Sequence, residues 1–251
     1  MVAILACVLH QTIISHATAI PEWYTVSAAH PPRSEGWDVN LWSGRYTRNM
    51  RLTPRFLLSA MDVSHFPSEA KTYGAPEIAF LGRSNVGKSS LINALLGSKE
   101  AHTSSTPGRT RAINFFTLHE GSGDRMKPRP TLIFADLPGY GYAKISKSVS
   151  SEWPTFIEPY LAERETLALA VCLVDSNIPP QASDKQLIDF FKQTGLPYLV
   201  VATKSDRLSN NVLAKSVAAL KRFHEVEEVL PVSARNQAGI PALWQRLHSA
   251  A

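Results

Sequence analysis

The fold and the ligand of this chain are indicated by one stretch, Gly82-Arg83-Ser84-Asn85-Val86-Gly87-Lys88-Ser89. It matches the phosphate-binding loop pattern G-x-x-x-x-G-K-[ST] at every fixed position. The two glycines let the backbone turn its N–H groups toward a phosphate, where side chains would obstruct the turn. Lys88 is expected to reach the β- and γ-phosphate oxygens, and the Ser89 hydroxyl to bind Mg²⁺. All eight residues are therefore predicted to bind a nucleotide.

The sequence on either side of this loop supports the prediction. Residues Ile78–Leu81 form an apolar run typical of a buried strand, and Ser90–Leu96 have the pattern of a helix. The loop thus joins a strand to a helix, which places a bound anion at the helix N-terminus.

From residue 50 onward, apolar runs alternate with amphipathic segments, which predicts an α/β fold: a doubly wound, mainly parallel sheet with helices on both faces. The predicted strands are Phe56–Val63, Glu77–Leu81, Ala112–Leu118, Thr131–Ala135, Ala168–Val174, Tyr198–Thr203 and Val229–Val232. The predicted helices are Ser89–Leu96, a stretch within Lys147–Arg164, Ser183–Thr194, Asn210–Phe223 and Ile240–His248. The Gly-rich and Pro-rich segment 120–130 predicts a hairpin connection rather than a crossover helix.

Composition sets wider limits. The chain has 251 residues, of which 44% are hydrophobic and 19% charged, so it can bury a full core as a soluble protein. Its formal charge of +5 is compatible with a nucleic-acid partner and equally with a solvated lysine-rich surface. Cys7 and Cys172 are too far apart in sequence to suggest a disulfide framework or a zinc site, which favours a cytoplasmic location.

Residues 1–49 differ from the rest because they show no clear helical or strand period. Their apolar opening is too short to span a bilayer, and no basic residue precedes it. We hypothesise that 1–49 is a disordered extension or a misassigned gene start, with Met50 beginning the working protein. Two regions are thus predicted: an extension at 1–49 and a nucleotide-binding domain at 50–251.

Asp136-Leu137-Pro138-Gly139 follows the predicted strand Thr131–Ala135. A carboxylate at the carboxyl end of that strand would face the phosphate loop and hold Mg²⁺ through water. Gly139 would bring its backbone N–H to a γ-phosphate. Alone, this tetrapeptide is also a common turn.

Thr203-Lys204-Ser205-Asp206 ends another apolar strand. The Asp206 carboxylate can accept paired hydrogen bonds from guanine, and adenine offers no such pair of donors, so this residue predicts selection of GTP over ATP. The Lys204 stem would pack over the base. A helix cap is the alternative interpretation. Val232-Ser233-Ala234 ends the last strand, where backbone N–H groups could bond the guanine carbonyl.

The segment Thr103–Arg111 is predicted to be a switch loop. A threonine here can place its hydroxyl on Mg²⁺ and its N–H on the γ-phosphate, so that the loop is ordered only with GTP. Thr106 and Thr110 both qualify, and Thr110 is preferred because it lies next to the following strand. A plain Ser/Thr/Gly-rich connector is the alternative.

Taken together, these motifs resemble the EngB/YihA family of bacterial GTPases, within the TrmE-Era-EngA-EngB-like group. The residues that carry the resemblance are the phosphate loop and Ser90-Leu91-Ile92-Asn93, Thr106-Pro107-Gly108-Arg109-Thr110, Ile113-Asn114-Phe115-Phe116, Asp136-Leu137-Pro138-Gly139-Tyr140-Gly141-Tyr142-Ala143 and Thr203-Lys204-Ser205-Asp206. The similarity runs from about Met50 to the C-terminus, and its most specific part is Pro-Gly-Tyr-Gly-Tyr-Ala.

The resemblance implies a Ras-like fold and a GTP/GDP switch acting in large ribosomal subunit assembly, with a traditional link to division septum formation. It implies that the partner is a precursor of that subunit, with both its rRNA and its ribosomal proteins. It also implies that the protein is a monomer and has no membrane partner. It also implies Mg²⁺ bound through Ser89 and Thr110. Five further nucleotide contacts are implied at Gly108, Arg109, Thr110, Arg111 and Ala112.

Catalysis is expected from Lys88, Thr110 and Asn85. Tyr140 stands where Ras-type enzymes place a water-orienting glutamine, which predicts slow intrinsic hydrolysis that a partner or cation completes. In related GTPases an asparagine at the place of Asn85 helps to hold a monovalent cation, so K⁺ is a candidate activator; a loop-shaping role for Asn85 is the alternative. Arg109 and Arg111 could pair with phosphates or contact RNA.

Two further interpretations stay open. Tyr140 and Tyr142 could stack on RNA or pack against the moving loop. The rival function is a phosphotransferase or ATPase with the same phosphate loop, which would leave Asp206 unexplained.

Overall fold

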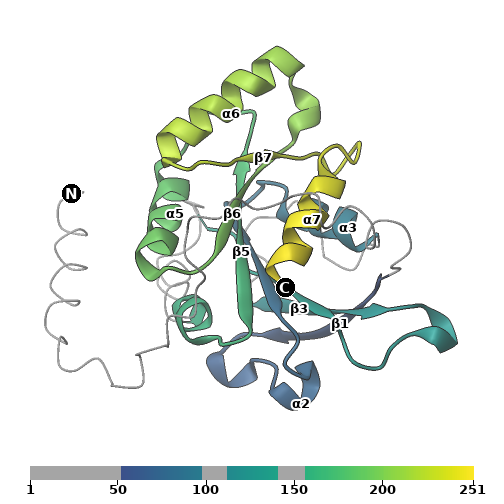
Figure 1. The fold of residues 1–251 in the computed structure, drawn as a ribbon. Helices are drawn as coiled ribbons and strands as arrows, with labels where there is room; N and C mark the ends of the chain where they lie inside the picture. The colour runs from purple at the N-terminus through teal and green to yellow at the C-terminus, as the bar shows by residue number, and fades with distance from the viewer. Residues whose placement is uncertain (1–51, 98–111, 141–155) are drawn as a thin grey trace, which may run out of the picture. The chain divides into compact units, whose positions relative to one another are not determined.

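The computed structural model describes residues 52–97, 112–140 and 156–251, and in that part of the chain seven strands form one sheet (Figure 1). Their order across the sheet is β1-β3-β4-β2-β5-β6-β7. The strands are β1 (Leu52–Ala60), β2 (Glu77–Gly82), β3 (Ile113–Glu120), β4 (Leu132–Asp136), β5 (Leu167–Asp175), β6 (Tyr198–Thr203) and β7 (Leu230–Pro231).

The sheet is mainly parallel, as predicted. Strand β2 pairs in parallel with β4 and β5, and β6 pairs in parallel with β5 and β7. Strand β3 runs antiparallel to β4, so the segment between them is the predicted hairpin connection. Strand β1 pairs antiparallel to β3 at the edge of the sheet.

Helices cover both faces of this sheet (Figure 1). The helical elements are α2 (Glu69–Thr72), residues 156–163, α3 (Lys88–Leu96), α5 (Ala182–Thr194), α6 (Asn210–His224) and α7 (Ile240–Ala250), with short 3-10 turns η2 (Val63–His65), η3 (Gly123–Arg125) and η4 (Ser205–Arg207). Helices α5 and α6 and residues 156–163 pack in one hydrophobic core, and α3 and α7 pack in the other. Alternate residues of β2 divide between them, since Ala79 and Leu81 join the first core while Ile78 and Phe80 join the second. This confirms the doubly wound α/β prediction.

The boundaries of the edge strand were predicted wrongly. Strand β1 begins at Leu52 and ends at Ala60, whereas the predicted strand was Phe56–Val63. Residues 63–65 instead form η2, because the Asp62 carboxylate accepts a hydrogen bond from the Ser64 N–H at 2.9 Å and caps that turn. The early start follows from pairing with β3, where Leu52 lies opposite Glu120.

The parallel strands bring the predicted motifs together. Strands β2, β4, β5, β6 and β7 all run in the same direction, so their carboxyl ends meet at one edge of the sheet. The phosphate loop, Asp136, Lys204 and Val232 each follow or end one of these strands. In open α/β sheets this edge is where ligands bind.

Candidate nucleotide-binding site

The phosphate loop has the backbone that its sequence predicts. It connects β2 to α3, and the helix begins at Lys88 immediately after Gly87. Gly87 has φ of 102°, which glycine adopts readily, and Asn85 has φ of 66°, a region that asparagine tolerates better than most residues. The strand–loop–helix arrangement is confirmed, and it leaves the N-terminus of α3 facing the loop.

Gly82 is required for space rather than for a special φ. A Cβ atom at this position would lie 2.8 Å from Val86 Cγ1 and 2.9 Å from Leu173 Cβ. Any side chain here would therefore push the loop away from β5. Glycine at this position lets the loop pack closely against the core.

Lys88 and Asp136 form an ion pair at the base of the loop. Both side chains are almost fully buried, with residue exposures of 9% and 3%. Two groups expected to serve phosphate and metal are thus in contact with each other. A buried lysine and a buried carboxylate each need a partner of opposite charge, and here each supplies the other.

The donors near this pair suit Mg²⁺. Ser89 follows Lys88 in the first turn of α3, and Asp136 ends β4 beside it. A hydroxyl, a carboxylate and phosphate oxygens are the oxygen ligands that Mg²⁺ prefers. The residues present therefore fit the ion. In the described residues there is no group of three His, Cys, Asp or Glu side chains that could hold a metal by themselves.

The Asp136–Gly139 segment packs directly against the phosphate loop. The Ser84 N–H donates to the Tyr140 carbonyl at 3.0 Å, and the Tyr140 N–H donates to the Gly82 carbonyl at 3.3 Å. A Cβ atom on Gly139 would lie 3.1 Å from the Ser84 backbone. Gly139 is therefore held against the backbone of the phosphate loop.

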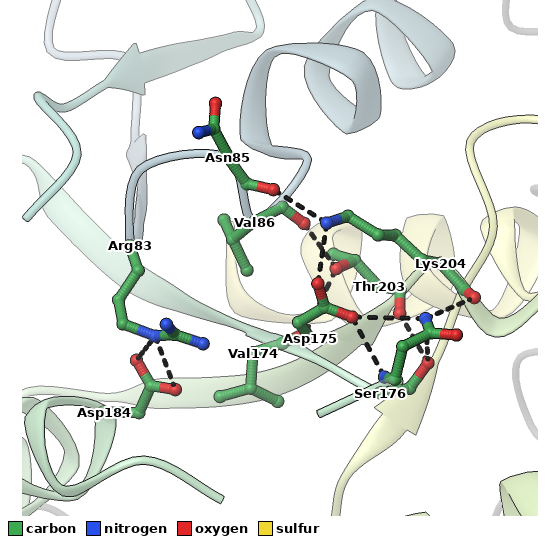
Figure 2. A network of polar contacts seen from close by, with 10 residues as sticks. Arg83, Asn85, Val86, Val174, Asp175, Ser176, Asp184, Thr203 and Lys204 are labelled. Atoms are coloured by element: carbon green, nitrogen blue, oxygen red, sulfur yellow. Dashed lines mark hydrogen bonds and ion pairs between the residues drawn. The ribbon is translucent and has the colours of Figure 1, made fainter. Parts of the chain in front are cut away.

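Strand β6 is fastened to the same loop (Figure 2). The Thr203 hydroxyl donates to the Val86 carbonyl at 2.6 Å, and Lys204 Nζ donates to the Asn85 carbonyl at 2.8 Å. Both loop carbonyls thereby gain partners that the loop itself does not supply. The Thr203–Asp206 motif, which is predicted to read the base, therefore also supports the phosphate loop.

Lys204 also forms an ion pair with Asp175, a residue that the sequence analysis did not identify. Its Oδ2 lies 2.6 Å from Lys204 Nζ (Figure 2). Burial alone would raise the pKa of Asp175, but hydrogen bonds from Lys204 and Asn177 outweigh burial and hold the pKa below its ordinary value. Its place as the last residue of β5, at the ligand-binding edge, was the available signal.

The two predicted base-reading segments are joined by a side-chain bond. The Ser233 hydroxyl donates to Asp206 Oδ1 at 2.6 Å, and the Ser205 N–H donates to the Val232 carbonyl at 3.1 Å. Ser233 is fully buried and also accepts from the Arg235 N–H at 3.1 Å. The Asp206 carboxylate thus lies beside the Val232–Ala234 segment, whose contact with the guanine carbonyl stays a prediction. Of the predicted N–H donors there, those of Val232 and Ser233 already donate to the Ala202 and Ala238 carbonyls at 2.8 and 2.9 Å.

A second missed residue is Asp184 on α5. It accepts hydrogen bonds from Arg83 of the phosphate loop and from the Tyr140 hydroxyl. No motif marks Asp184 in the sequence, and the predicted helix gave only its secondary structure. Tyr140 itself is partly buried and packs against the core.

Several predicted residues lie outside the described part of the chain. Among these are Gly108, Arg109, Thr110 and Arg111, so the switch-loop contacts and the second predicted Mg²⁺ ligand stay predictions. Thr106, Tyr142 and the 1–49 region lie outside it too. Ala112 is described and is buried just before β3. No helix in the described residues is long and apolar enough to cross a membrane.

Comparison with known proteins shows the family of this chain. A family model described as the 50S ribosome-binding GTPase matches residues 77–204. A "Probable GTP-binding protein EngB" of Acidobacterium capsulatum is 60% identical over 202 residues, which cover 80% of this chain and 92% of that protein. Its namesake in Clostridioides difficile is 40% identical over 194 residues, covering 76% of this chain and 89% of that protein.

Solved structures agree. The crystal structure of a probable GTP-binding protein EngB superposes with a TM-score of 0.56 at 25% identity, covering 69% of this chain and 97% of the other. A crystal structure of Era in complex with MgGDPNP and part of 16S ribosomal RNA has a TM-score of 0.55 at 23% identity, covering 70% of this chain and 56% of the other, and it shows the shared fold alone. The chain therefore belongs to the 50S ribosome-binding GTPases and, among them, to the EngB proteins.

Proposed function

We propose that this GTPase is a GTP/GDP switch in assembly of the large ribosomal subunit, binding precursor particles in one nucleotide state and leaving them in the other. The family match over residues 77–204 carries this proposal, because it spans the phosphate loop, Asp136 and Lys204. The formal charge of +5 suits a partner made largely of RNA. The same proposal includes a link to division septum formation.

The ion pair of Lys88 and Asp136 suggests how the site exchanges partners. On binding MgGTP, Lys88 turns to the β- and γ-phosphate oxygens, which replace the Asp136 carboxylate as its anionic partner. Ser89 and Thr110 are the proposed direct ligands of Mg²⁺, with Asp136 acting through water. The ion supplies neutralisation of charge on the β- and γ-phosphates.

Intrinsic hydrolysis is proposed to be slow. A glutamine that orients water is replaced by Tyr140, whose hydroxyl donates to Asp184 at 3.0 Å and which carries no amide to hold a water molecule. Completion of the reaction is assigned to a partner or to a cation. Lys88 and Thr110 are the proposed groups for stabilising the charge of the transition state.

K⁺ is the proposed cation, with Asn85 as its ligand. Asn85 is exposed, and Lys204 binds its backbone carbonyl, while Figure 2 shows its side-chain amide directed away from that contact. A cation beside the phosphates would add positive charge where the transition state needs it. GTP turnover should therefore be faster in KCl than in NaCl, and Asn85→Ala should remove the difference. Equal turnover of the wild-type protein in both salts would contradict this assignment.

Co-sedimentation tests the assembly role. The full chain is mixed with large-subunit precursor particles in the presence of a non-hydrolysable GTP analogue or GDP. Association in one nucleotide state is expected, and equal association or none in both states would contradict the role. Asp206→Asn sharpens the test, since its association should follow the xanthine analogue instead of the guanine one.

A phosphotransferase or ATPase remains the rival class. It requires ATP to bind, whereas the Asp206 carboxylate would be left unpaired beside adenine. Tight binding of GDP without binding of ATP in calorimetry excludes it.

A further inference from the structure

Asp184 joins three segments that are distant in the sequence. It lies in the first turn of α5, with a residue exposure of 2%. Its carboxylate accepts from Arg83 Nε at 3.1 Å (Figure 2) and from the Tyr140 hydroxyl at 3.0 Å. Arg83 belongs to the phosphate loop, and Tyr140 follows Gly139. The carboxylate therefore links α5, the phosphate loop and the segment expected to sense the γ-phosphate.

The charges make this link a firm one. Burial raises the pKa of Asp184, and the Arg83 guanidinium opposes that rise. Burial and the neighbouring Asp184 raise the pKa of Tyr140 well above its ordinary value, so its hydroxyl keeps its proton and donates at neutral pH. A buried carboxylate with two charge-assisted partners is costly to separate from either of them.

The link reinforces a backbone contact at the same residue. The Tyr140 carbonyl accepts from the Ser84 N–H at 3.0 Å, and Gly139 packs on Ser84. Tyr140 is thus held through its backbone by the phosphate loop and through its side chain by Asp184. Arg83 precedes Ser84 in the phosphate loop and donates to the same Asp184 carboxylate. Gly139 is fixed between these contacts.

A purely structural role can be judged against a second example in the chain. Glu77 is fully buried and accepts from the Tyr160 hydroxyl at 2.9 Å and from Arg164 Nε at 2.9 Å. Both sets contain one carboxylate, one tyrosine and one arginine, and Glu77 also accepts from the Thr166 hydroxyl at 2.8 Å. Glu77 begins β2, at the end of the strand opposite the phosphate loop, so its partners hold the core and not the site. Of these two carboxylates, Asp184 is the one whose tyrosine and arginine partners both belong to segments predicted to bind the nucleotide.

We propose that Asp184 is a positioning residue that holds Gly139 in place for the γ-phosphate and thereby raises the affinity for GTP relative to GDP. This inference rests on the proposed GTP/GDP switch. The phosphate loop is expected to wrap mainly the phosphates that GTP and GDP share, whereas Gly139 is expected to contact the additional one. Ordering Gly139 before binding removes a cost that GTP alone would otherwise bear.

The hydroxyl of Tyr140 gives the cleanest test. Tyr140→Phe keeps the ring and removes the bond to Asp184, and Tyr160→Phe removes the equivalent bond to Glu77. Binding of a non-hydrolysable GTP analogue and of GDP is measured by calorimetry with Mg²⁺ present. Tyr140→Phe should weaken the analogue about 5-fold while GDP changes less than about 2-fold, and Tyr160→Phe should leave the ratio of the two unchanged. Equal weakening of both nucleotides by Tyr140→Phe, or no change, overturns the proposal.

A double mutant tests whether Tyr140 acts through Asp184. In an Asp184→Ala background, Tyr140→Phe should add no further change in the GTP-to-GDP affinity ratio. Additive changes would overturn the proposal even if both single variants fold poorly, because the ratio is measured on the binding-competent protein. Failure of the wild-type chain to bind any guanine nucleotide would contradict the proposed function, whereas normal wild-type binding with an unaltered Tyr140→Phe ratio contradicts this inference alone.

Discussion

The Ser233 hydroxyl donates a hydrogen bond of 2.6 Å to Asp206 Oδ1, across 27 positions of sequence. Ser233 is itself held, since its oxygen accepts from the backbone N–H groups of Arg235 and Asn236 at 3.1 and 3.3 Å. The carboxylate that we propose to select guanine is therefore already held in one orientation by Ser233. Preorganisation of this kind lowers the cost of binding.

Removing the Ser233 hydroxyl should weaken guanine binding. We expect Ser233→Ala to raise the dissociation constant for GDP about 5- to 10-fold, because Asp206 loses a hydrogen-bonded neighbour that orients it. Calorimetry measures the change. Ser249→Ala is the matched control, since that exposed hydroxyl bonds the Gln245 carbonyl within α7. A Ser233→Ala variant that binds GDP as the wild type does would show that the orientation is not needed.

The Thr203 hydroxyl should support both stability and nucleotide binding. Thr203→Val keeps the shape but leaves the Val86 and Val174 carbonyls without this donor, which lies 2.6 and 3.1 Å from them. We expect the free energy of unfolding to fall by about 1–3 kcal/mol and GDP affinity to fall with it. Urea denaturation and calorimetry measure the two effects. Thr203→Ser retains the hydroxyl and should behave nearly as the wild type; identical behaviour of the valine and serine variants would refute the role.

Gly82 should tolerate no side chain. An added Cβ would meet Val86 and Leu173 at less than 3.0 Å, so Gly82→Ala should displace the phosphate loop and weaken GDP binding at least about 10-fold. The comparison is Gly97→Ala at the end of α3, where an added Cβ meets nothing within 4 Å but the φ of 62° is unfavourable for alanine. That variant should lose some stability and keep its GDP affinity. Tight GDP binding by Gly82→Ala would contradict the spatial argument.

His224 should make the protein sensitive to mild acid. Its ring is fully buried, and neither ring nitrogen has a hydrogen-bond partner in the described structure. Burial lowers the pKa of His224, Lys185 and Lys192 of α5 lower it further, and Asp189 opposes them. The unfolded chain therefore takes up the proton more readily than the folded one. The stability that depends on neutral His224 is fully present above the ordinary pKa of 6.5 and is lost as pH falls through the lower folded value.

Urea denaturation between pH 8 and pH 5 measures this effect. The free energy of unfolding of the wild type should fall more steeply toward pH 5 than that of His224→Leu, which has no group to protonate there. Contributions from other titrating groups are common to both proteins and cancel in the difference. Parallel pH profiles would show that His224 is not the responsible group.

The sequence predicted those parts of the site whose chemistry is local. The phosphate loop, Asp136 and the Thr203–Asp206 motif each combine a short pattern with a flanking strand, and all were placed correctly at the sheet edge. Asp175 and Asp184 were missed because their partners are 29 and 101 positions away, and nothing local marks a carboxylate for a distant lysine or arginine. The interior strands were predicted well for a similar reason, since two covered faces produce continuous apolar runs.

The bounds of the edge strand β1 could not be predicted from the local sequence. Among the residues that the structure describes, strand β1 pairs with β3 alone, and one of its faces is partly exposed. Its apolar pattern is therefore weak, and its ends depend on the length of that partner. The bulge between Phe56 and Leu58 shifts the alternation again. Such features follow from pairing between strands far apart in the sequence.

Nucleotide selection by Asp206 is the central claim, and one set of titrations tests it directly. Wild-type protein and Asp206→Asn are titrated with GDP, ATP and xanthosine diphosphate in the presence of Mg²⁺. The wild type should prefer GDP over ATP by at least about 1000-fold. Asp206→Asn should lose about 100-fold in affinity for GDP and gain affinity for xanthosine diphosphate, because the base carbonyl can accept a hydrogen bond from the new amide. Comparable binding of ATP and GDP by the wild type, or unchanged GDP affinity in Asp206→Asn, would contradict it.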